Sequence, residues 1–588
     1  MLEYKGKLNL LIDLCKKKKY DGYILPSTDE YLNEYVPEHK QRLKWLTGFS
    51  GSNGIFLYFD GLFYFFTDGR YLVQAKSELP PWFKIYDISI NSIYDFLIKK
   101  KSIKSKICID SKINSVQFVL KLIRITRSTK IKIFPGSKIL IDKLFEICET
   151  STTKKAFILD DKYSGCSAKK KINLIKKKIE CDQCYIITSP ESTAWLLNLR
   201  GYDLDFTPIV MSRMIFFGSG EVYLYIKKKK LSSEINFLFS RIGISVRTED
   251  QIYDDIGKIN KKKKILIDKE SSYFFYHQIK KKKLELIMID DICKKEKSIK
   301  NKVEISNIKK VHVRDAVAII KFMYWLEKKM VISRFNELQV SQKLENFRKE
   351  EDSYFSPSFD TISATGKNAS IIHYNPKNTK SKILNSDELY LCDSGGQYFG
   401  GTTDITRTFF IGNKKPKKEY IEIYTEVLKG HIDLAKMRFP ENTLGIQIDA
   451  IARYNLWNHG KDYNHGTGHG VGCFLGVHEG PQSFSKRSFK EPIKEGMILS
   501  NEPGFYKNLN YGVRLENLIL VKKSTYKNFL EFENLTLVPF ERKLINKKKL
   551  NETQIRWINE YHKLVYKLVA VFLSKEIKVW LKNKIKSI

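Results

Sequence analysis

Short apolar runs alternate with helical stretches over the first quarter of the chain. In residues 1–150 the apolar runs are "DGYILPS", "NGIFLYF", "LFYFFTDGRYL" and "KICID". Runs of this length, bounded by glycine, proline or polar residues, predict buried strands, and the stretches between them carry helical periodicity. We therefore expect an α/β domain over residues 1–150.

Residues 151–302 repeat this pattern. "GYILPSTDEYL" followed by "WLTGF" in the first segment corresponds to "CYIITSPESTAWLLNLRG" in the second, and both lead into aromatic-rich strands. A repeat of this kind indicates two related α/β domains rather than one larger unit. Connections are expected near residues 150–157 and 293–304, where polar and lysine-rich residues separate the patterned segments.

The third segment, residues 303–588, mixes helices and strands. It opens with a predicted helix over 304–330, whose apolar residues recur every three or four positions, and continues through strands such as "DELYLCDS" and "TRTFFIG". It closes with an amphipathic stretch over 553–585 that ends in cationic residues. The broad apolar face of this stretch favours packing on the domain or on a second subunit over contact with a membrane.

Composition bounds the class of protein. The chain has 588 residues, 103 Lys and Arg against 66 Asp and Glu, and a formal net charge of +37. Much of the excess lies in the lysine runs at 16–19, 227–230, 261–264 and 280–283, which lack the interleaved arginines and aromatics of a nucleic-acid groove, so we interpret them as solvated. No apolar run reaches the roughly 18 residues of a membrane span. Nine scattered cysteines, a lone "CDQC" and no visible signal peptide favour a cytoplasmic protein.

Three stretches of the third segment contain no lysine, although the chain is rich in it: 387–413, 462–485 and 495–506. A lysine ammonium competes with a divalent cation for the same oxygens, so its absence is what a metal site requires. These windows and the next motif, "GVRLENL", hold the candidate ligands Asp393, Asp404, His465, His469, His478, Glu479, Glu502 and Glu516.

Two of these acids flank a predicted hairpin in "LCDSGGQYFGGTTDITRT", residues 391–408. With the turn centred near Tyr398 and Phe399, Asp393 and Asp404 face each other with their Cβ atoms roughly 5 Å apart, where like charges repel. A cation is therefore expected between them. Taken singly, each acid has a structural explanation. Together, four carboxylates and one imidazole indicate two divalent cations, held by Asp393, Asp404, His469, Glu502 and Glu516.

The motifs resemble a known family. "CDSGGQYFGGTTDITRT", "HGTGHGVG", "VHEGP", "LSNEPGFY" and "GVRLENL", in this order, resemble the dinuclear metallopeptidases of pita-bread fold. "STDEYLNEYVPEHKQRLKWLTGFSGSNG", "TDGRYLVQA" and "WLLNLRGYDLDFTPI" resemble the three-domain aminopeptidase P family. The resemblance implies creatinase-like α/β domains at 1–150 and 151–302. It also implies an α+β pita-bread catalytic domain with a C-terminal helical extension at 303–588.

The resemblance also implies roles for the ligands. By this resemblance, Asp404 and Glu516 bridge two metal ions that lie about 3.5–4 Å apart and share a water molecule. The resemblance favours Mn²⁺, and Co²⁺ and Zn²⁺ are the alternatives. Asp393 belongs to one ion, while His469 and Glu502 belong to the other. Glu502 also carries a proton from the water to the leaving amine.

Further residues match substrate-binding positions of the family. His373 in "SIIHYNP" and His478 in "VHEGP" contact the substrate and stabilise the charge on its carbonyl oxygen. Arg70 in "TDGRY" reaches toward the substrate across a dimer interface. Arg514 is expected to orient Glu516, and His465 to support the site without binding metal.

The resulting hypothesis is a homodimeric metallo-aminopeptidase that removes the first residue from peptides with proline at position two. Proline specificity is implied by the resemblance alone. The alternative in the same class is an Xaa-Pro dipeptidase, which shares the metal ligands but has one α/β domain ahead of the catalytic one. The alternative from another class is a nucleic-acid-binding relative without activity, favoured by the +37 charge and disfavoured by the complete ligand set. We expect neither nucleic acid nor a membrane as partner.

Overall fold

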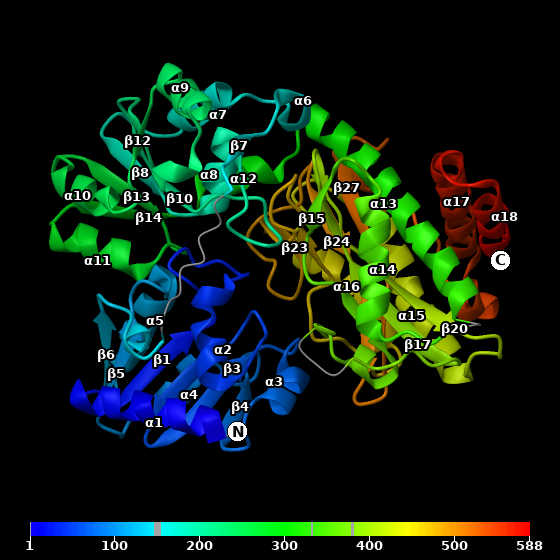
Figure 1. Cartoon of the computed structure of the whole chain (residues 1–588), viewed down its shortest axis with the longest axis horizontal. Helices are drawn as coiled ribbons and strands as arrows, with labels where there is room; N and C mark the ends of the chain where they lie inside the picture. Colours follow the sequence, from blue (N-terminus) through cyan, green and yellow to red (C-terminus); the bar gives the residue numbers. More distant parts are fainter. Residues whose placement is uncertain (1, 146–153, 331–332, 378–380) are drawn as a thin grey trace. The chain divides into compact units, whose positions relative to one another are not determined.

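The computed structural model of the chain describes residues 2–145, 154–330, 333–377 and 381–588 (Figure 1). The chain divides into two compact units. The first unit comprises residues 1–160, 166–204 and 208–294, and the second comprises residues 161–165, 205–207 and 295–588.

The first unit contains two six-stranded sheets. The first has the order β4-β3-β2-β1-β5-β6, with β1 antiparallel to β2, β2 antiparallel to β3 and the other neighbours parallel. Its strands are β1 (Gly22–Pro26), β2 (Ile55–Phe59), β3 (Leu62–Thr67), β4 (Phe83–Asp87), β5 (Ser105–Asp110) and β6 (Ile131–Gly136). Its helices are α1 (Leu2–Lys17), α2 (Arg42–Thr47), α3 (Leu72–Glu78), α4 (Ile93–Lys99) and α5 (Val116–Thr126).

The second sheet has the order β12-β11-β10-β8-β13-β14 and repeats each parallel and antiparallel pairing of the first. Its strands are β8 (Gln183–Ile187), β10 (Ser212–Phe217), β11 (Val222–Ile226), β12 (Ile244–Arg247), β13 (Lys264–Asp268) and β14 (Glu285–Ile289). Its helices are α7 (Ala168–Lys176), α8 (Pro190–Leu197), α9 (Ser233–Arg241), α10 (Gln251–Lys258) and α11 (Tyr273–Lys281), and β7 (Phe157–Ile158) pairs with β9 (Leu199–Arg200). The prediction of two related α/β domains is confirmed.

The burial of the central strands explains why apolar runs in the sequence identified them. All five residues of β1, "GYILP", are buried, as is expected of a strand covered on both faces. The predicted boundary at residue 150 lies outside the described residues. The connection expected over 293–304 contains the boundary between the two units, after Lys294, and it is partly helical: it includes most of α12 (Ile292–Ser298) and the start of α13 at Lys302.

The second unit is α+β. Its strands form two three-stranded sheets, β15-β18-β19 and β16-β17-β20, a six-stranded sheet β21-β28-β27-β24-β22-β23 and the hairpin β25-β26. The strands are β15 (Tyr354–Pro357), β16 (Ile362–Thr365), β17 (Glu388–Ser394), β18 (Gly396–Tyr398), β19 (Gly401–Thr402), β20 (Ile405–Ile411), β21 (Arg438–Pro440), β22 (Gly468–Gly470), β23 (Glu479–Phe484), β24 (Ile498–Asn501), β25 (Gly504–Lys507), β26 (Tyr511–Arg514), β27 (Asn517–Lys523) and β28 (Phe529–Asn534). The helices are α6 (Asp161–Ser164), α13 (Lys302–Lys329), α14 (Glu337–Lys349), α15 (Lys418–Ala435), α16 (Gly445–Trp457), α17 (Glu552–Val569) and α18 (Lys575–Lys584).

The helices of the second unit cover its sheets through one large apolar core. This core joins buried residues of α13, α14, α15 and α17 to β17, β20 and β26. The C-terminal stretch predicted over 553–585 is two helices, since Ser574 caps a new helix, and α17 buries Ile558, Tyr561 and Val565 in the core. The stretch therefore packs on its own domain. Among the described helices, none combines the length and apolarity needed to cross a bilayer.

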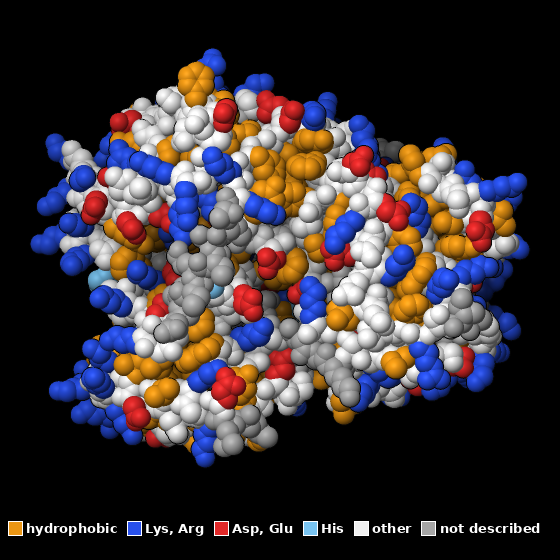
Figure 2. Space-filling model, viewed as in Figure 1, with side chains coloured by type: hydrophobic (Ala, Val, Ile, Leu, Met, Phe, Trp, Pro, Cys, Tyr) orange, Lys and Arg blue, Asp and Glu red, His pale blue; other side chains and the backbone are white. Residues whose placement is uncertain are grey.

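The lysine runs are mostly at the surface. In the runs at 16–19, 261–264 and 280–283 every lysine is exposed or partly exposed. The exception is Lys230, which is buried and pairs with Asp203 at 2.5 Å. Figure 2 shows Lys and Arg side chains scattered over the visible face and mixed with acids, which supports the solvated interpretation.

Asp110, at the end of β5, predicts a pH dependence for the stability of the first unit. The Tyr23 hydroxyl and the Leu140 amide donate to its carboxyl group, and burial raises its pKa from 3.8 to about 7. The folded state therefore binds a proton that the unfolded state loses above about pH 4, so the free energy of unfolding falls as pH rises from about 4 to about 7. Asp110→Asn removes this contribution. We expect the thermal midpoint of the wild type, relative to the variant, to drop by several degrees between pH 5 and pH 8.

The control is Asp60→Asn in the exposed turn between β2 and β3, which should leave that pH dependence unchanged. Parallel melting curves of the wild type and Asp110→Asn at every pH would contradict the assignment.

Candidate functional site

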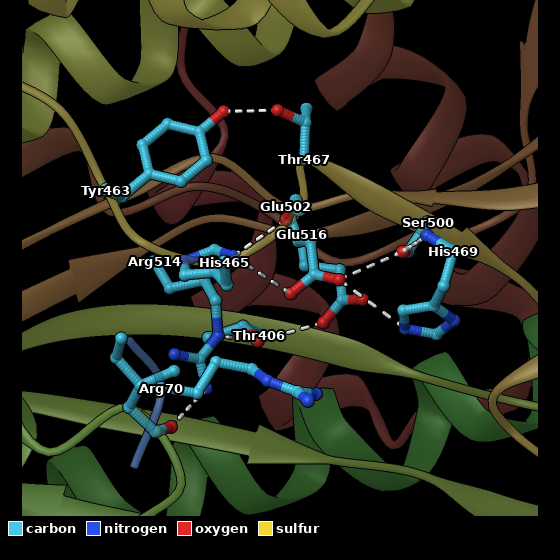
Figure 3. A network of polar contacts seen from close by, with 12 residues as sticks. Arg70, Thr406, Tyr463, His465, Thr467, His469, Ser500, Glu502, Arg514 and Glu516 are labelled. Atoms are coloured by element: carbon cyan, nitrogen blue, oxygen red, sulfur yellow. Dashed lines mark hydrogen bonds and ion pairs between the residues drawn. The ribbon is translucent and has the colours of Figure 1, made fainter. Parts of the chain in front are cut away.

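Five predicted ligands come from five places in the second unit. Asp393 lies at the end of β17, Asp404 just before β20, His469 in β22, Glu502 just after β24 and Glu516 between β26 and β27. Ligand atoms of Asp404, His469 and Glu516 lie within 4.8 Å of one another. The His469 Nε2 atom is 3.4 Å from the Glu502 Oε1 atom and 3.5 Å from the Asp404 Oδ2 atom (Figure 3). Four of the five therefore converge directly, and Asp393 joins them through Arg514.

The hairpin between β17 and β20 forms, but its register differs from the predicted one. Residue Asp393 lies opposite Thr406, because the chain turns at Phe399 and Gly400 rather than at Tyr398 and Phe399. Shifting the turn by one residue moves every cross-strand partner by two positions. Asp404 is therefore a diagonal neighbour of Asp393, and Thr406 occupies the place predicted for Asp404.

Each of two buried acids has one oxygen held by the protein and one without a protein donor. Arg514 donates to the Asp393 Oδ2 atom at 2.5 Å, and the Thr406 hydroxyl donates to the Glu516 Oε2 atom at 2.9 Å. Among the described residues, Asp393 Oδ1 and Glu516 Oε1 are buried without a hydrogen-bond partner. Buried carboxylate oxygens rarely lack a partner, so this pattern fits a metal pair in which the second oxygens coordinate the ions.

The charges of the site require a cation. Burial raises the pKa of Asp393 to about 7, with Arg514 opposing and Asp404 adding to the shift. Burial, followed by the charges of Asp404 and Glu502, raises the pKa of Glu516 well above its ordinary value. Carboxylates crowded in this way stay ionised together only when positive charge lies among them.

The Nε2 atom of His469 is the ring nitrogen that faces the acids. Its Nδ1 atom is 3.0 Å from the Gly470 carbonyl oxygen and can only donate to it, so in the neutral ring Nε2 is unprotonated. Burial opposes a charge on this ring, but Asp404 and Glu502 raise its pKa to about 9. A metal ion at Nε2 replaces that proton, as is usual for a histidine ligand whose other nitrogen is fixed by a carbonyl group.

A network behind the acids includes the histidine whose role the sequence left open. The His465 Nδ1 atom lies 2.8 Å from the Gly466 carbonyl oxygen, and its Nε2 atom lies 2.9 Å from the Tyr506 hydroxyl. Arg514 donates to the same hydroxyl at 2.7 Å, so the tyrosine donates its own proton to His465. Both nitrogens of His465 are therefore engaged by protein groups, which agrees with a supporting role.

Arg514 contacts one acid directly and a second acid indirectly. Its ion pair is with Asp393 and not with Glu516. Its hydrogen-bond path to Glu516 runs through Thr406, because its Nε donates to the Thr406 hydroxyl oxygen at 3.1 Å and that hydroxyl donates to Glu516. One guanidinium group thus orients acids on two sides of the site.

The predicted substrate-binding residues are placed in part. The His478 ring meets the His469 ring edge to face, with centroids 4.4 Å apart. His373 follows Ile372, whose carbonyl oxygen accepts a hydrogen bond from Arg514. Arg70 lies in the first unit, where it forms a two-point contact with Asp68.

The roles of several supporting residues, and that of Glu479, were not recognised from the sequence. The Ser500 hydroxyl donates to Glu502 and accepts from the His469 amide. The Thr467 hydroxyl donates to Asp449 and also hydrogen-bonds the Tyr463 hydroxyl (Figure 3). Thr406 and Ser500 each lie two residues from a predicted ligand, Asp404 and Glu502 respectively, and this spacing was the available signal. Glu479, a candidate by sequence, instead pairs with Lys297 and Lys300.

Comparison with protein families covers nearly the whole chain. Residues 306–523 match Metallopeptidase family M24, and residues 528–588 match the C-terminal region of peptidase M24. Residues 7–143 and 149–304 each match a Creatinase/Prolidase N-terminal domain. The fold and these matches together define an M24 metallopeptidase preceded by two creatinase-type domains.

Individual relatives show to which family of M24 metallopeptidases the chain belongs. The chain is 36% identical over 607 residues to Xaa-Pro aminopeptidase 1 of Dictyostelium discoideum, covering 99% of this chain and 96% of the relative. The X-prolyl aminopeptidase of Caenorhabditis elegans, described as a cytosolic enzyme with a di-nuclear active site, superposes with a TM-score of 0.92 at 31% identity, covering 97% of this chain and 95% of that one. The chain belongs to the Xaa-Pro aminopeptidase family of metallopeptidases.

A dipeptidase structure matches less of the chain. The Xaa-Pro dipeptidase of Bacillus anthracis has a TM-score of 0.52 at 23% identity and covers 64% of this chain but 99% of its own. It shares the fold over that part. The match leaves the remaining third of the present chain uncovered.

Thr406 predicts a measurable effect on metal binding. Thr406→Val keeps the shape of the side chain but removes the donor to Glu516 and the acceptor for Arg514. Loss of such an outer contact lowers metal affinity by about 10- to 100-fold, and we expect a weakening of this size in a calorimetric titration of the metal-free protein with Mn²⁺.

Thr408→Val is the matched control on the same strand, because the Thr408 hydroxyl bonds only to the backbone of Arg514. It should change the Mn²⁺ affinity by less than about threefold. Equal affinities for the wild type and Thr406→Val would show that Glu516 does not need this contact.

Proposed function

We propose that the protein is a metal-dependent aminopeptidase that hydrolyses the bond between the first residue of a peptide and a proline at position two. The observation that carries this proposal is the convergence of Asp404, His469, Glu502 and Glu516, linked to Asp393 through Arg514, in a member of this family. The enzyme acts on peptides; neither a nucleic acid nor a membrane is part of the proposal.

The residues proposed to hold the metals are Asp393, Asp404, His469, Glu502 and Glu516. Four carboxylates and one imidazole suit two Mn²⁺ ions, since oxygen-rich sites favour Mn²⁺ and four negative charges balance two divalent cations. Such ions, when bound, polarise the scissile carbonyl group and make a water molecule nucleophilic near neutral pH.

The remaining chemistry is assigned to side chains of the chain. Glu502 is proposed to take the proton from the attacking water and to deliver it to the proline nitrogen as the bond breaks. The proline nitrogen must gain one proton to leave as an amine, and the attacking water supplies that proton through Glu502. His373 and His478 donate hydrogen bonds to the carbonyl oxygen as negative charge develops there, and Arg70 binds the substrate farther from the reacting bond.

The enzyme is proposed to act in the cytoplasm as a homodimer. The C. elegans neighbour is described as cytosolic. For the dimer, the supporting feature is a stripe of three apolar residues on α16: Ile451, Tyr454 and Trp457 are 37%, 60% and 45% exposed. The charged residues of α16, Asp449 and Arg453, are buried and paired with each other. In a chain of net charge +37, a helix whose own charged residues are buried is where a second copy can approach.

Metal removal and substrate choice test the function. After chelation the protein should lose activity, and Mn²⁺ should restore it. The restored enzyme should release arginine from Arg-Pro-Pro, with a kcat/KM on the order of 100-fold above that for an Arg-Pro dipeptide. Elemental analysis of Glu516→Gln, which lacks one bridging ligand, should show less than two metal ions per chain.

Preference for the dipeptide would favour the dipeptidase hypothesis. No peptide hydrolysis in Mn²⁺, together with nucleic-acid binding that weakens steeply with salt, would favour the non-enzymatic relative.

The dimer is tested by light scattering after size-exclusion chromatography. We expect the wild type to elute as a dimer and Trp457→Glu to elute as a monomer, since a buried unpaired carboxylate disrupts an apolar interface. Phe572→Glu is the control, because Phe572 is also exposed but lies outside the α16 stripe. A monomeric wild type, or a dimeric Trp457→Glu, would contradict this interface.

A further inference from the structure

Glu479 forms a buried ion cluster with two lysines from a segment 180 residues earlier. The Lys297 Nζ atom lies 2.9 Å from Glu479 Oε2, and the Lys300 Nζ atom lies 2.5 Å from Glu479 Oε1. All three side chains are at most 2% exposed. Lys300 also donates to the Lys297 carbonyl oxygen at 2.8 Å, and the Gln482 amide donates to Glu479. Both oxygens of Glu479 are thus occupied by protein donors, so this acid is not available as a metal ligand.

Such a cluster is costly to bury. Each ammonium group loses its hydration, and one carboxylate balances only one of the two positive charges. Burial disfavours the ionised form of Glu479, yet Lys297 and Lys300 lower its pKa below the ordinary value. Lys295, on the same helix as Lys297, is the contrasting case. The side chains of Lys295 and Glu491 are 49% and 21% exposed, so their ion pair contributes little to stability.

The cluster lies next to the reacting centre along the chain. Glu479 directly follows His478, and the His478 ring contacts the His469 ring. In the sheet, Glu479 pairs with Gly470, the residue after His469. Glu479 is therefore adjacent to His478 along the chain, and its strand partner Gly470 is adjacent to His469.

The backbone pairing of β22 with β23 fixes the position of Glu479 only weakly. The pairing of β22 with β23 is irregular: His469 lies opposite Ser483, but the next residue, Gly470, lies opposite Glu479. Residues 480–482 are passed over, so the ladder that would fix Glu479 is interrupted at the start of β23, directly after His478. The side chain of Glu479, fixed by two lysines, supplies the anchor that the ladder lacks.

We propose that Glu479, with Lys297 and Lys300, is a positioning residue that fixes the His478 ring against His469. This inference rests on the proposed function, in which His478 stabilises the charge on the substrate carbonyl oxygen. Glu479 touches neither substrate nor reacting atoms, so it acts through His478.

A double-mutant cycle tests this, since a residue that acts only through another has no effect once that other is gone. The four proteins are wild type, Glu479→Gln, His478→Ala and the double variant, each loaded with Mn²⁺ and assayed on Arg-Pro-Pro. We expect Glu479→Gln to lower kcat by about 10-fold in the wild-type background and by less than about twofold in the His478→Ala background, with KM changing little. Equal losses in both backgrounds, or no loss in either, would overturn the proposal.

The matched control is Lys295→Met, which removes a surface ion pair from the same segment and should leave kcat unchanged. If Glu479→Gln does not fold, Lys297→Met and Lys300→Met each leave Glu479 one lysine. Each of these should lower kcat in the wild-type background but not in the His478→Ala background. An equal effect in both backgrounds again overturns the proposal.

A readout without peptide hydrolysis separates this inference from the function. Co²⁺ bound at His469 gives visible absorption bands that depend on the orientation of the ring. Because the His478 ring packs against the His469 ring, we expect Glu479→Gln to change the orientation of His469 and shift these bands, and Lys295→Met to leave them as in the wild type. A wild type that binds Co²⁺ but cleaves no Xaa-Pro peptide contradicts the function alone, whereas identical bands for wild type and Glu479→Gln contradict the positioning role.

Discussion

The repulsion among the buried carboxylates of the second unit is the constraint on which the site depends. Asp393, Asp404, Glu502 and Glu516 come from separate strands and loops, and burial strengthens every interaction between their charges. Without positive charge among them, the cost of burial and the repulsion are relieved by protonation, and for this reason the pKa values of Asp393 and Glu516 are raised. The architecture must hold these groups together against that repulsion and leave the space between them for cations.

The strands meet this constraint through close approach and fixed donors. Gly468 allows β22 to lie against β24, because a Cβ atom there would be 1.9 Å from the Ser500 carbonyl oxygen. Ser500 then bonds both the His469 amide and Glu502. Arg514 and Thr406 hold the outer oxygens of Asp393 and Glu516 in the same manner. For Asp393 and Glu516, this leaves the second carboxylate oxygen without a hydrogen-bond partner among the described residues.

The sequence predicted local features well and long-range geometry poorly. The apolar runs predicted both α/β sheets, and the lysine-free windows led to His469 and Glu502. The hairpin was expected, but its register was wrong by one residue at the turn, because glycines on both sides of Phe399 allow more than one turn position. The partners of Glu479 and Arg514 were missed for another reason. Lys297 is 182 residues from Glu479, and Arg514 is 121 residues from Asp393, so only the packed fold shows these contacts.

The placement of the buried cations shows how a strongly basic chain keeps an acidic centre available to metal. Arg514 and the Lys297–Lys300 cluster each bind an acid from outside, so their charges offset the carboxylates without entering the space between them. Arg407 goes further: its guanidinium group donates to the carbonyl oxygens of Thr406, Glu516 and Val538. It brings positive charge behind Glu516 while every acidic oxygen stays free of it. A lysine inside the centre would compete with the metal for the same oxygens, whereas cations one layer out lower the repulsion in the metal-free protein and still leave the ligands for divalent ions.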